Sequence, residues 1–251
     1  MEPIIVKYLE KPQLNEPVLI EGLPGVGNVG KISAEYLKEK LQAKLFVEIY
    51  SKYLPPQVLM KGDGTLYLVK NEMYYHKNPN GRDLIILVGD YQGMNAEGQY
   101  ELSYKVLEIA KELGTKLIFT LGGYGTGNLV EEPRVFGAAT DMEMVEEMKE
   151  YGVYFSPSDP SGGIVGAAGL LLGLGSVAFD MRGVCLMGET SGYFSDPKSA
   201  LNVLKIVDRY FNLSLDLEEM ELRSKEITEI TSQIKEEQKE EERHEDLGYI
   251  G

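Results

Sequence analysis

Runs in which consecutive residues, not alternate ones, are hydrophobic set the strongest limit on how this chain can fold. They span Val18–Leu23, Asp83–Asp90 and Lys116–Gly122, and a helix is predicted after each of them. A strand that is apolar on both sides is typical of a parallel or mixed sheet that is covered on both faces. This alternation predicts an α/β fold, with a sheet flanked by helices on both faces.

Further elements fill the intervals. Strands are predicted at Leu45–Tyr50 and Val184–Gly188, and a hairpin from Leu66–Lys70 and Met73–His76 around Asn71-Glu72. Helices are predicted after Asn28, from Ala96 to Gly114, over about Thr140–Glu150, through Ile164–Leu172, and from Pro197 to Asn212. The 17 residues before the first apolar run have room for one more strand.

Negative charge is concentrated near the C-terminus. The chain has a formal net charge of −15, which repels phosphodiester backbones and anionic membrane surfaces. Between Asp216 and Asp246 there are 13 acidic and 5 basic residues, so more than half of the excess lies in this stretch. This asymmetry predicts two parts: an α/β domain over residues 1–212, and an acidic helical arm with an apolar tail over residues 213–251.

Cysteine usage and apolar segments indicate the compartment. Cys185 is the single cysteine, so no intramolecular disulfide can form and a reducing environment is favoured. The first 17 residues show no basic region followed by an apolar one, so no secretory signal is predicted. The apolar stretch Ile164–Phe179 is shorter than the roughly 20 residues that cross a bilayer. We therefore expect a cytoplasmic protein.

The acidic arm contains a narrow apolar stripe. Its members are Leu217, Met220, Ile227, Ile230 and Ile234, with polar residues at intervening positions. Such a helix is marginally stable alone in water. It is either a solvated charged helix or an arm that packs on a neighbouring subunit of an oligomer.

The last residues turn apolar directly after the charged stretch. Leu247, Tyr249, Ile250 and Gly251 form an aromatic terminus. Exposed apolar ends of this kind are suited to docking into a pocket of a partner protein. We expect these residues to bind a partner.

A glycine-rich turn links the first apolar run to the helix that follows. Gly25, Gly27, Asn28 and Gly30 belong to a G-x-G-x-x-G pattern, which in dinucleotide-binding folds holds phosphate at a helix N-terminus. Glu48 lies 18 residues further on, where such folds place a ribose-binding carboxylate, but it sits inside a predicted strand. The alternative is a tight turn that needs glycine for conformation and close packing.

Other residues offer little for catalysis or metal binding. The two histidines, His76 and His244, are too few for a metal cluster or a histidine-based triad. Asp90 and Glu189 each lie at the end of a predicted strand, where α/β folds gather ligands. Carboxylates at such places cap turns more often than they catalyse. We expect no catalytic residue and no metal site.

Several of these segments together resemble the PAC2 family, the relatives of the eukaryotic proteasome assembly chaperone 2. They are Glu21–Gly30, Gly122–Thr126, Ser161–Gly166, Leu170–Gly173 and Val184–Tyr193. The resemblance covers roughly Pro17 to Asn212. It implies a fold like that of purine nucleoside phosphorylases, self-association, and in archaeal members an interaction with proteasome α-subunits. Some members end in a hydrophobic–tyrosine–any tripeptide, whereas Tyr249 here is third from the end.

Together, the residues and the resemblance predict a non-catalytic, proteasome-assembly-chaperone-like protein. It is expected to form a homo-oligomer larger than a dimer, and to bind proteasome α-subunits or a paralogue, without a cofactor. The alternative is a nucleotide- or nucleoside-binding enzyme that uses the Gly25–Gly30 turn with Asp90 and Glu189. A third hypothesis is a scaffold that only assembles itself.

Overall fold

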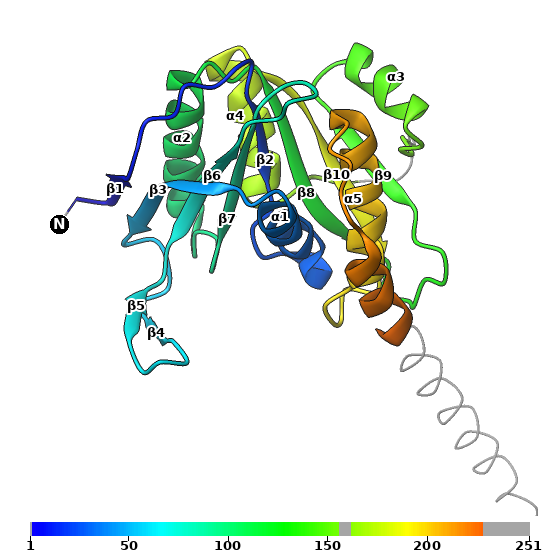
Figure 1. Ribbon diagram of the computed structural model, residues 1–251, viewed down its shortest axis with the longest axis horizontal. Helices are drawn as coiled ribbons and strands as arrows, with labels where there is room; N and C mark the ends of the chain where they lie inside the picture. Colours follow the sequence, from blue (N-terminus) through cyan, green and yellow to red (C-terminus); the bar gives the residue numbers. More distant parts are fainter. Residues whose placement is uncertain (1, 156–161, 228–251) are drawn as a thin grey trace, which may run out of the picture.

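The computed structural model describes residues 2–155 and 162–227, which form an eight-stranded mixed sheet with helices on both faces (Figure 1). The strand order is β1-β3-β6-β7-β2-β8-β10-β9. The strands are β1 (Ile4–Tyr8), β2 (Val18–Glu21), β3 (Lys44–Ser51), β6 (Asn71–His76), β7 (Leu84–Gly89), β8 (Leu117–Gly125), β9 (Val135–Ala139) and β10 (Arg182–Thr190). The predicted α/β fold is confirmed.

The four central strands, β7, β2, β8 and β10, run parallel, and the remaining strands pair antiparallel on either side. Every residue of β2 and β7 is buried. Continuous burial explains why these strands are apolar at consecutive positions, since helices cover both of their faces. β1 occupies the edge and pairs with β3, as the space before the first apolar run allowed.

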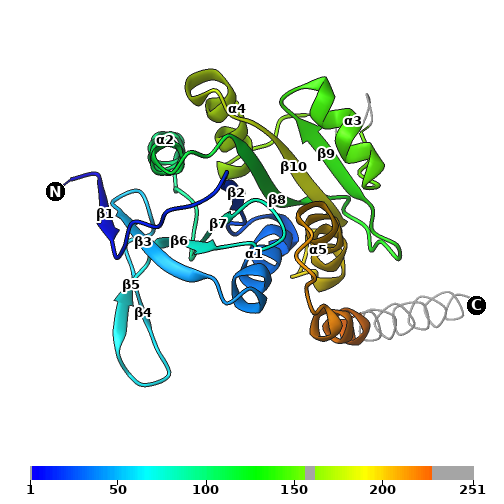
Figure 2. The same ribbon diagram turned by 45° about the horizontal axis from the view of Figure 1, so that its top comes forward.

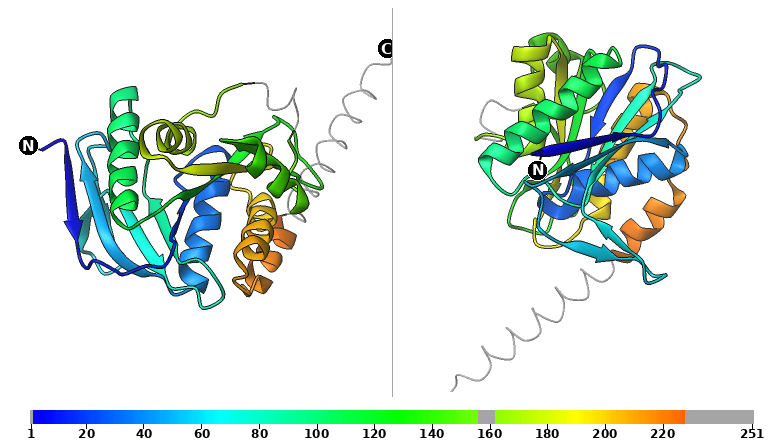
Figure 3. Two further views of the ribbon diagram at one scale, coloured as in Figure 1. Left: turned by 90° about the horizontal axis from the view of Figure 1, so that it is seen from above. Right: turned by 90° about the vertical axis from the view of Figure 1, so that its left-hand side faces the viewer.

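Two hydrophobic cores lie on opposite faces of the sheet. Helices α1 (Val29–Lys40), α3 (Met142–Glu150) and α5 (Pro197–Phe211) cover one face, and α2 (Ala96–Glu112) and α4 (Ala167–Phe179) the other (Figure 3). Side chains along β2 point alternately to the two faces of the sheet, so Ile20 packs in the first core and Leu19 in the second.

Local signals fix the helix ends. Asn95 caps α2 by accepting from Gly98 N at 2.8 Å, and Asp196 caps α5 by accepting from Ser199 N at 2.9 Å. Beyond α2, Gly114 takes a φ of +89°, the left-handed conformation that glycine adopts at low cost. These ends agree with the predicted ones. By contrast, α4 begins at Ala167 and runs to Phe179, which is later than the predicted helical stretch Ile164–Leu172.

The predicted hairpin of Leu66–Lys70 with Met73–His76 is wrong. Strand β5 (Leu66–Leu68) pairs with β4 (Val58–Met60) in a separate two-stranded sheet. The neighbouring strand β6 enters the large sheet between β3 and β7 instead. The pairing of β6 with β3 joins residues more than 20 positions apart, such as Glu48 and Glu72. Local β-propensity indicates strands but not which strands pair.

Residues 213–227 pack against the α/β domain. Residues 218–227 are helical, and within this segment Met220 is fully buried in the core that contains Leu37 and Leu204. Among the described residues, no helix has both the length and the hydrophobicity needed to span a bilayer.

Candidate functional site

Loops that follow the parallel strands meet at one edge of the sheet, called here the carboxyl edge. Because β2, β7, β8 and β10 run in the same direction, their C-terminal ends lie together, where α/β proteins most often bind ligands. Hydrogen bonds join the loops: Gln92 Nε2 donates to Pro24 O at 2.7 Å, and Thr126 N donates to Thr190 O at 2.8 Å. The glycine-rich turn lies at the centre of this arrangement.

Close packing explains Gly22, Gly27 and Gly30, whereas a Cβ on Gly25 would meet nothing nearer than Gln92 Nε2 at 4.0 Å. A Cβ on Gly30, in the first turn of α1, would lie 2.0 Å from Leu121 O, and one on Gly22 would lie 2.2 Å from Gly30 O. Gly27 has a φ of +60° within the short 3₁₀ helix η1 (Val26–Asn28) and packs on Thr190. Only glycine fits such contacts without moving backbone. The tight-turn interpretation therefore accounts for this part of the motif.

Polar groups of the turn bind to the chain itself. Asn28 N donates to Gly25 O at 2.9 Å, and the Asn28 side chain, whose backbone is left-handed, donates to Ser195 Oγ at 3.0 Å. Asp196 N donates to Gly27 O at 2.9 Å. These bonds tie the turn to the loop after β10. One backbone N–H group that could hold a phosphate, that of Asn28, is thus already bonded within the turn.

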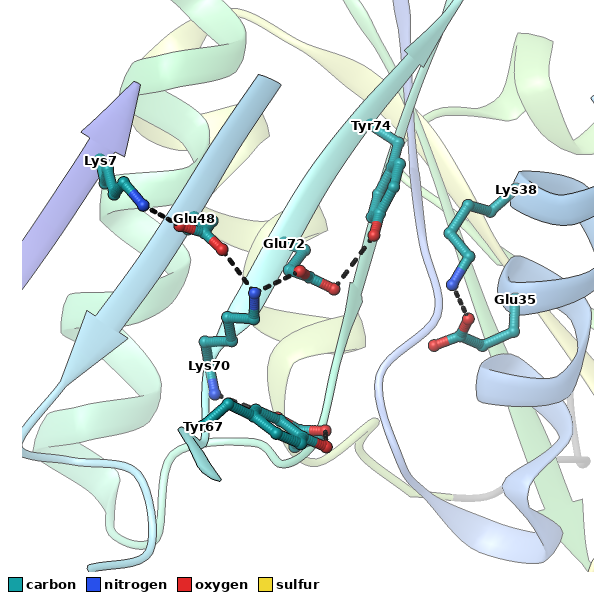
Figure 4. A network of polar contacts seen from close by, with 9 residues as sticks. Lys7, Glu35, Lys38, Glu48, Tyr67, Lys70, Glu72 and Tyr74 are labelled. Carbon is teal, nitrogen blue, oxygen red and sulfur yellow. Dashed lines mark hydrogen bonds and ion pairs between the residues drawn. The ribbon is translucent and has the colours of Figure 1, made fainter. Parts of the chain in front are cut away.

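Glu48 does not stand near the glycine-rich turn. In a dinucleotide-binding fold, the ribose carboxylate ends the strand beside the glycine motif, but here β6 and β7 separate β3 from β2. Instead Glu48 forms an ion pair with Lys7 Nζ at 2.9 Å and another with Lys70, which also pairs with Glu72 at 2.7 Å (Figure 4). Burial alone would raise the pKa of Glu48, but hydrogen bonds from Lys70 and Lys7 lower it to about 2.

The strand-end carboxylates Asp90 and Glu189 also have structural partners. Asp90 Oδ2 accepts from Lys70 N at 3.1 Å and follows β7. Glu189, within β10, accepts a two-pronged bond from Arg134, with Nη2 to Oε1 at 2.9 Å and Nε to Oε2 at 3.1 Å. The Arg134 hydrogen bond holds the pKa of Glu189 below its usual value. Since β2 and β8 lie between β7 and β10, the sheet does not bring the two carboxylates together.

The sequence interpretation overlooked a buried carboxyl group beneath the turn. Glu21 ends β2, is 1% exposed, and accepts from Leu23 N at 2.9 Å through Oε1. Burial raises the pKa of Glu21 to about 8, so the group is mostly protonated at neutral pH. Across the adjacent strands it lies beside Thr120, which in turn lies beside Cys185. A single acidic residue inside the apolar run Val18–Leu23 was the signal for this group.

This row of polar side chains is closed to solvent. Cys185 is fully buried, and burial raises the pKa of its thiol to about 12, far from the range of a reactive thiolate. Neither Glu21 nor Cys185 therefore meets a substrate at the surface. Within residues 2–155 and 162–227, no group of three or more histidine, cysteine, aspartate or glutamate residues could hold a metal ion.

The residues predicted for the arm lie partly inside the described structure. Met220 is buried in its own chain's core, a position that the prediction of a contact with another subunit did not anticipate. Leu217 packs partly buried on the same core, and Tyr36 Oη donates to Asp216 O at 2.8 Å. Lys40 and Glu219 form an ion pair at 2.9 Å. The first part of the predicted arm thus stabilises the monomer, and Ile227 is partly buried near its end.

The remaining predicted contact residues lie outside the described part of the chain. These are Ile230 and Ile234 of the arm, and Leu247, Tyr249, Ile250 and Gly251 of the tail. Their roles stay predictions.

In its described residues the chain is thus an α/β protein. Helices cover both faces of its mixed eight-stranded sheet, and glycines line the carboxyl edge. The family model of the PAC2 family matches residues 19–235. The chain belongs to the PAC2 family.

Known relatives extend over nearly the whole chain. An uncharacterized protein of Methanocaldococcus jannaschii, MJ1210, is 38% identical over 246 residues, 95% of this chain and 93% of the relative. The crystal structure of Pyrococcus furiosus PbaB, an archaeal proteasome activator, is 40% identical, with a TM-score of 0.88 over 94% of this chain and 100% of PbaB.

A second solved structure is more distant. Pyrococcus furiosus PbaA, an archaeal homolog of proteasome-assembly chaperone, is 25% identical to this chain, with a TM-score of 0.74. The alignment covers 99% of this chain and 100% of PbaA.

Proposed function

We propose that this protein acts by binding partners, not by catalysis: it self-associates in the cytoplasm and binds subunits of the proteasome as a chaperone-like or activating factor. The observation that carries this proposal is the similarity to the proteasome activator PbaB, 40% identical with a TM-score of 0.88 over 94% of this chain. The similarity to PbaA, a homolog of proteasome-assembly chaperone, points the same way.

Geometry at the carboxyl edge supports a role without catalysis. Glu48 lies inside β3, away from this edge, and pairs with Lys7. Asp90 follows β7 and accepts from Lys70 N, whereas Glu189 lies within β10 and pairs with Arg134. General acid–base chemistry needs titratable groups that converge on an accessible site, whereas Glu21 lies buried below the surface.

We assign the partner contact to the C-terminal tail, and the assembly of subunits to the arm. The tail residues Leu247, Tyr249, Ile250 and Gly251 follow a strongly acidic stretch. In an oligomer several tails are presented at once, so contacts that are individually weak add up through effective concentration.

The test is the solution mass of the protein, alone and mixed with isolated proteasome α-subunits, by light scattering behind size exclusion. We expect a homo-oligomer larger than a dimer whose mass rises in the mixture. Tyr249→Ala should abolish the rise, whereas His244→Ala, a change in the acidic stretch just before the tail, should leave it intact. A monomer whose mass does not rise with α-subunits contradicts the proposal, and equal capture by both variants contradicts the role of the tail.

The nucleotide alternative has a separate test. A ligand that binds only the folded state raises the midpoint of thermal unfolding in proportion to RT ln(1 + [L]/Kd). We expect NAD, ATP and nucleosides at millimolar concentration to leave the midpoint unchanged. A reproducible rise with one of them would favour the enzyme hypothesis.

A further inference from the structure

The two-stranded sheet of β4 and β5 projects from the domain (Figures 1 and 2). One of its sides is apolar and exposed to solvent. In its register Val58 lies opposite Leu68, and Met60 lies opposite Leu66. Residues that lie opposite one another, or two apart along a strand, share a face. These four side chains, called here the outer face, are 45–80% exposed, with Met60 the most exposed.

The opposite side of the same hairpin is apolar too, but it faces the protein. Leu59 packs partly buried on the core beneath α2 and α4, and Tyr67 Oη donates to Asp90 Oδ1 at 3.4 Å. A hairpin with one side in water normally alternates apolar and polar residues, and two strands alone are marginally stable. A hairpin that is apolar on both sides is suited to being covered on both sides.

Uncharged loops continue this surface across the carboxyl edge. Gln57 Nε2, at the start of β4, donates to Tyr91 Oη at 2.6 Å. Segments 22–30, 91–95 and 190–195 contain no charged residue, although 26% of the chain is charged. They expose Val26, Met94 and Tyr193. Absence of charge together with exposed aromatic and methionine side chains is the composition of an interface core.

The charge of the chain limits which of its surfaces can contact a second copy. Each copy of the chain carries a formal charge of −15, so two copies repel wherever acidic surfaces meet. A two-fold contact places a patch against the same patch of the other copy, which makes any charged patch repel itself. A neutral apolar patch is free of this penalty and is complementary to itself.

The outer face alone is too small for a stable contact between two proteins. Four apolar side chains supply on the order of a few hundred Å², less than the about 800 Å² that each partner of a stable complex buries. A stable contact through this surface therefore has to include the neighbouring uncharged loops, where Tyr91 and Met94 are exposed.

We propose that two copies of this chain meet through a two-fold contact formed by the outer face of the β4–β5 hairpin and the uncharged loops beside it. This inference rests on the self-association in the proposed function and names the surface that produces it.

Matched methionines test the contact. Met60→Glu places a carboxylate on the outer face, and Met142→Glu does the same at the start of α3, which lies far from the hairpin in Figures 1 and 2 and where Met142 is 68% exposed. We expect Met60→Glu to weaken self-association at least tenfold, measured as the concentration dependence of mass by light scattering. Met142→Glu should match the wild type, and equal thermal midpoints exclude unfolding as the cause.

A second pair of variants gives a positive signal. Because Cys185 is fully buried, Met60→Cys introduces an accessible thiol. The proposed contact places its two-fold axis at the outer face, and a residue close to that axis lies about 10 Å from its own copy, the spacing of packed sheets. A short bis-maleimide should therefore join Met60→Cys chains into covalent dimers and leave Met142→Cys chains monomeric on denaturing gels.

The results of the two assays distinguish failure of the hairpin contact from failure of the proposed function. If the wild type is an oligomer and both methionine positions behave alike in both assays, the hairpin contact is overturned while self-association stands. If the wild type is a monomer at every concentration, self-association and the hairpin contact both fail, and capture of α-subunits is then judged by itself.

Discussion

At the scale of single residues, the glycines of the carboxyl edge act through their lack of a side chain. Gly30 brings α1 into contact with the backbone of β8, because a Cβ there would lie 2.0 Å from Leu121 O. The last glycine of the motif thus serves helix–sheet packing in this protein.

Gly30→Ala should therefore destabilise the fold, although alanine is the better helix former. We expect a loss of about 2 kcal/mol or more in the free energy of unfolding, from overpacking against backbone that cannot yield. Gly173→Ala is the matched control, because Gly173 lies in α4 with nothing within 4 Å of an added Cβ. It should gain up to about 1 kcal/mol. Chemical denaturation measures both, and a neutral Gly30→Ala would contradict the packing argument.

Glu21 is a second residue whose role depends on burial. Its folded pKa of about 8 exceeds the 4.5 of an unperturbed glutamate. The folded state therefore holds a proton that the unfolded state releases, so stability is fully present below about pH 4.5 and falls as the pH rises through 8.

Glu21→Gln removes this dependence, since glutamine keeps an oxygen for Leu23 N and cannot ionise. We expect the variant to match the wild type near pH 4 and to exceed it at pH 9. Each pKa unit corresponds to about 1.4 kcal/mol, and each kcal/mol to about 2–4 °C in the thermal midpoint. Thermal unfolding across this pH range is the measurement. A constant difference between the two proteins at every pH would show that folding does not raise the pKa of Glu21.

At the scale of elements, the helical segment 218–227 is part of the α/β domain and not a free arm. Met220 is fully buried against the core under α1 and α5, and the ion pair of Lys40 with Glu219 lies beside it. The narrow apolar stripe of the sequence begins with a residue that the monomer itself buries.

Met220→Ala should cost about 2–5 kcal/mol of unfolding free energy, because a buried side chain is removed and a cavity remains. Leu222→Ala, two residues further along the same helix and 60% exposed, should cost less than about 0.5 kcal/mol. Urea denaturation distinguishes them. Similar small costs for both would mean that this helix detaches from the domain in solution.

At the scale of the whole molecule, a charge of −15 opposes every contact between copies, while the outer face of the β4–β5 hairpin and the loops beside it are free of charge. Self-association through such a surface depends on apolar burial and is resisted by long-range repulsion.

Added salt should therefore strengthen self-association. Screening shortens the reach of charge from about 30 Å at 0.01 M to about 10 Å at 0.1 M ionic strength, which weakens repulsion and leaves apolar contact intact. We expect the dissociation constant of the oligomer to fall severalfold over this range, measured by light scattering. An oligomer that dissociates as salt is added would instead be held by ion pairs between subunits.

Most of the fold was predictable from patterns that are local in the chain. Consecutive apolar residues in Val18–Leu23 and Asp83–Asp90 indicated buried strands, and residues such as Pro197 and Gly114 indicated helix ends, because both signals depend on a residue and its near neighbours. Strand pairing was not local, so the hairpin predicted for Leu66–His76 was wrong.

By itself, the sequence determined the α/β class, the place of the glycine-rich turn between a strand and a helix, and the acidic C-terminal segment, since periodicity, composition and charge are properties of the residues themselves. Tertiary structure alone decided the rest. It separated Glu48 from the glycine turn by two strands, buried Glu21 and Met220, and left the outer face of the β4–β5 hairpin exposed. Distance, burial and exposure depend on which strands pair and which faces are covered, and long-range contacts fix those.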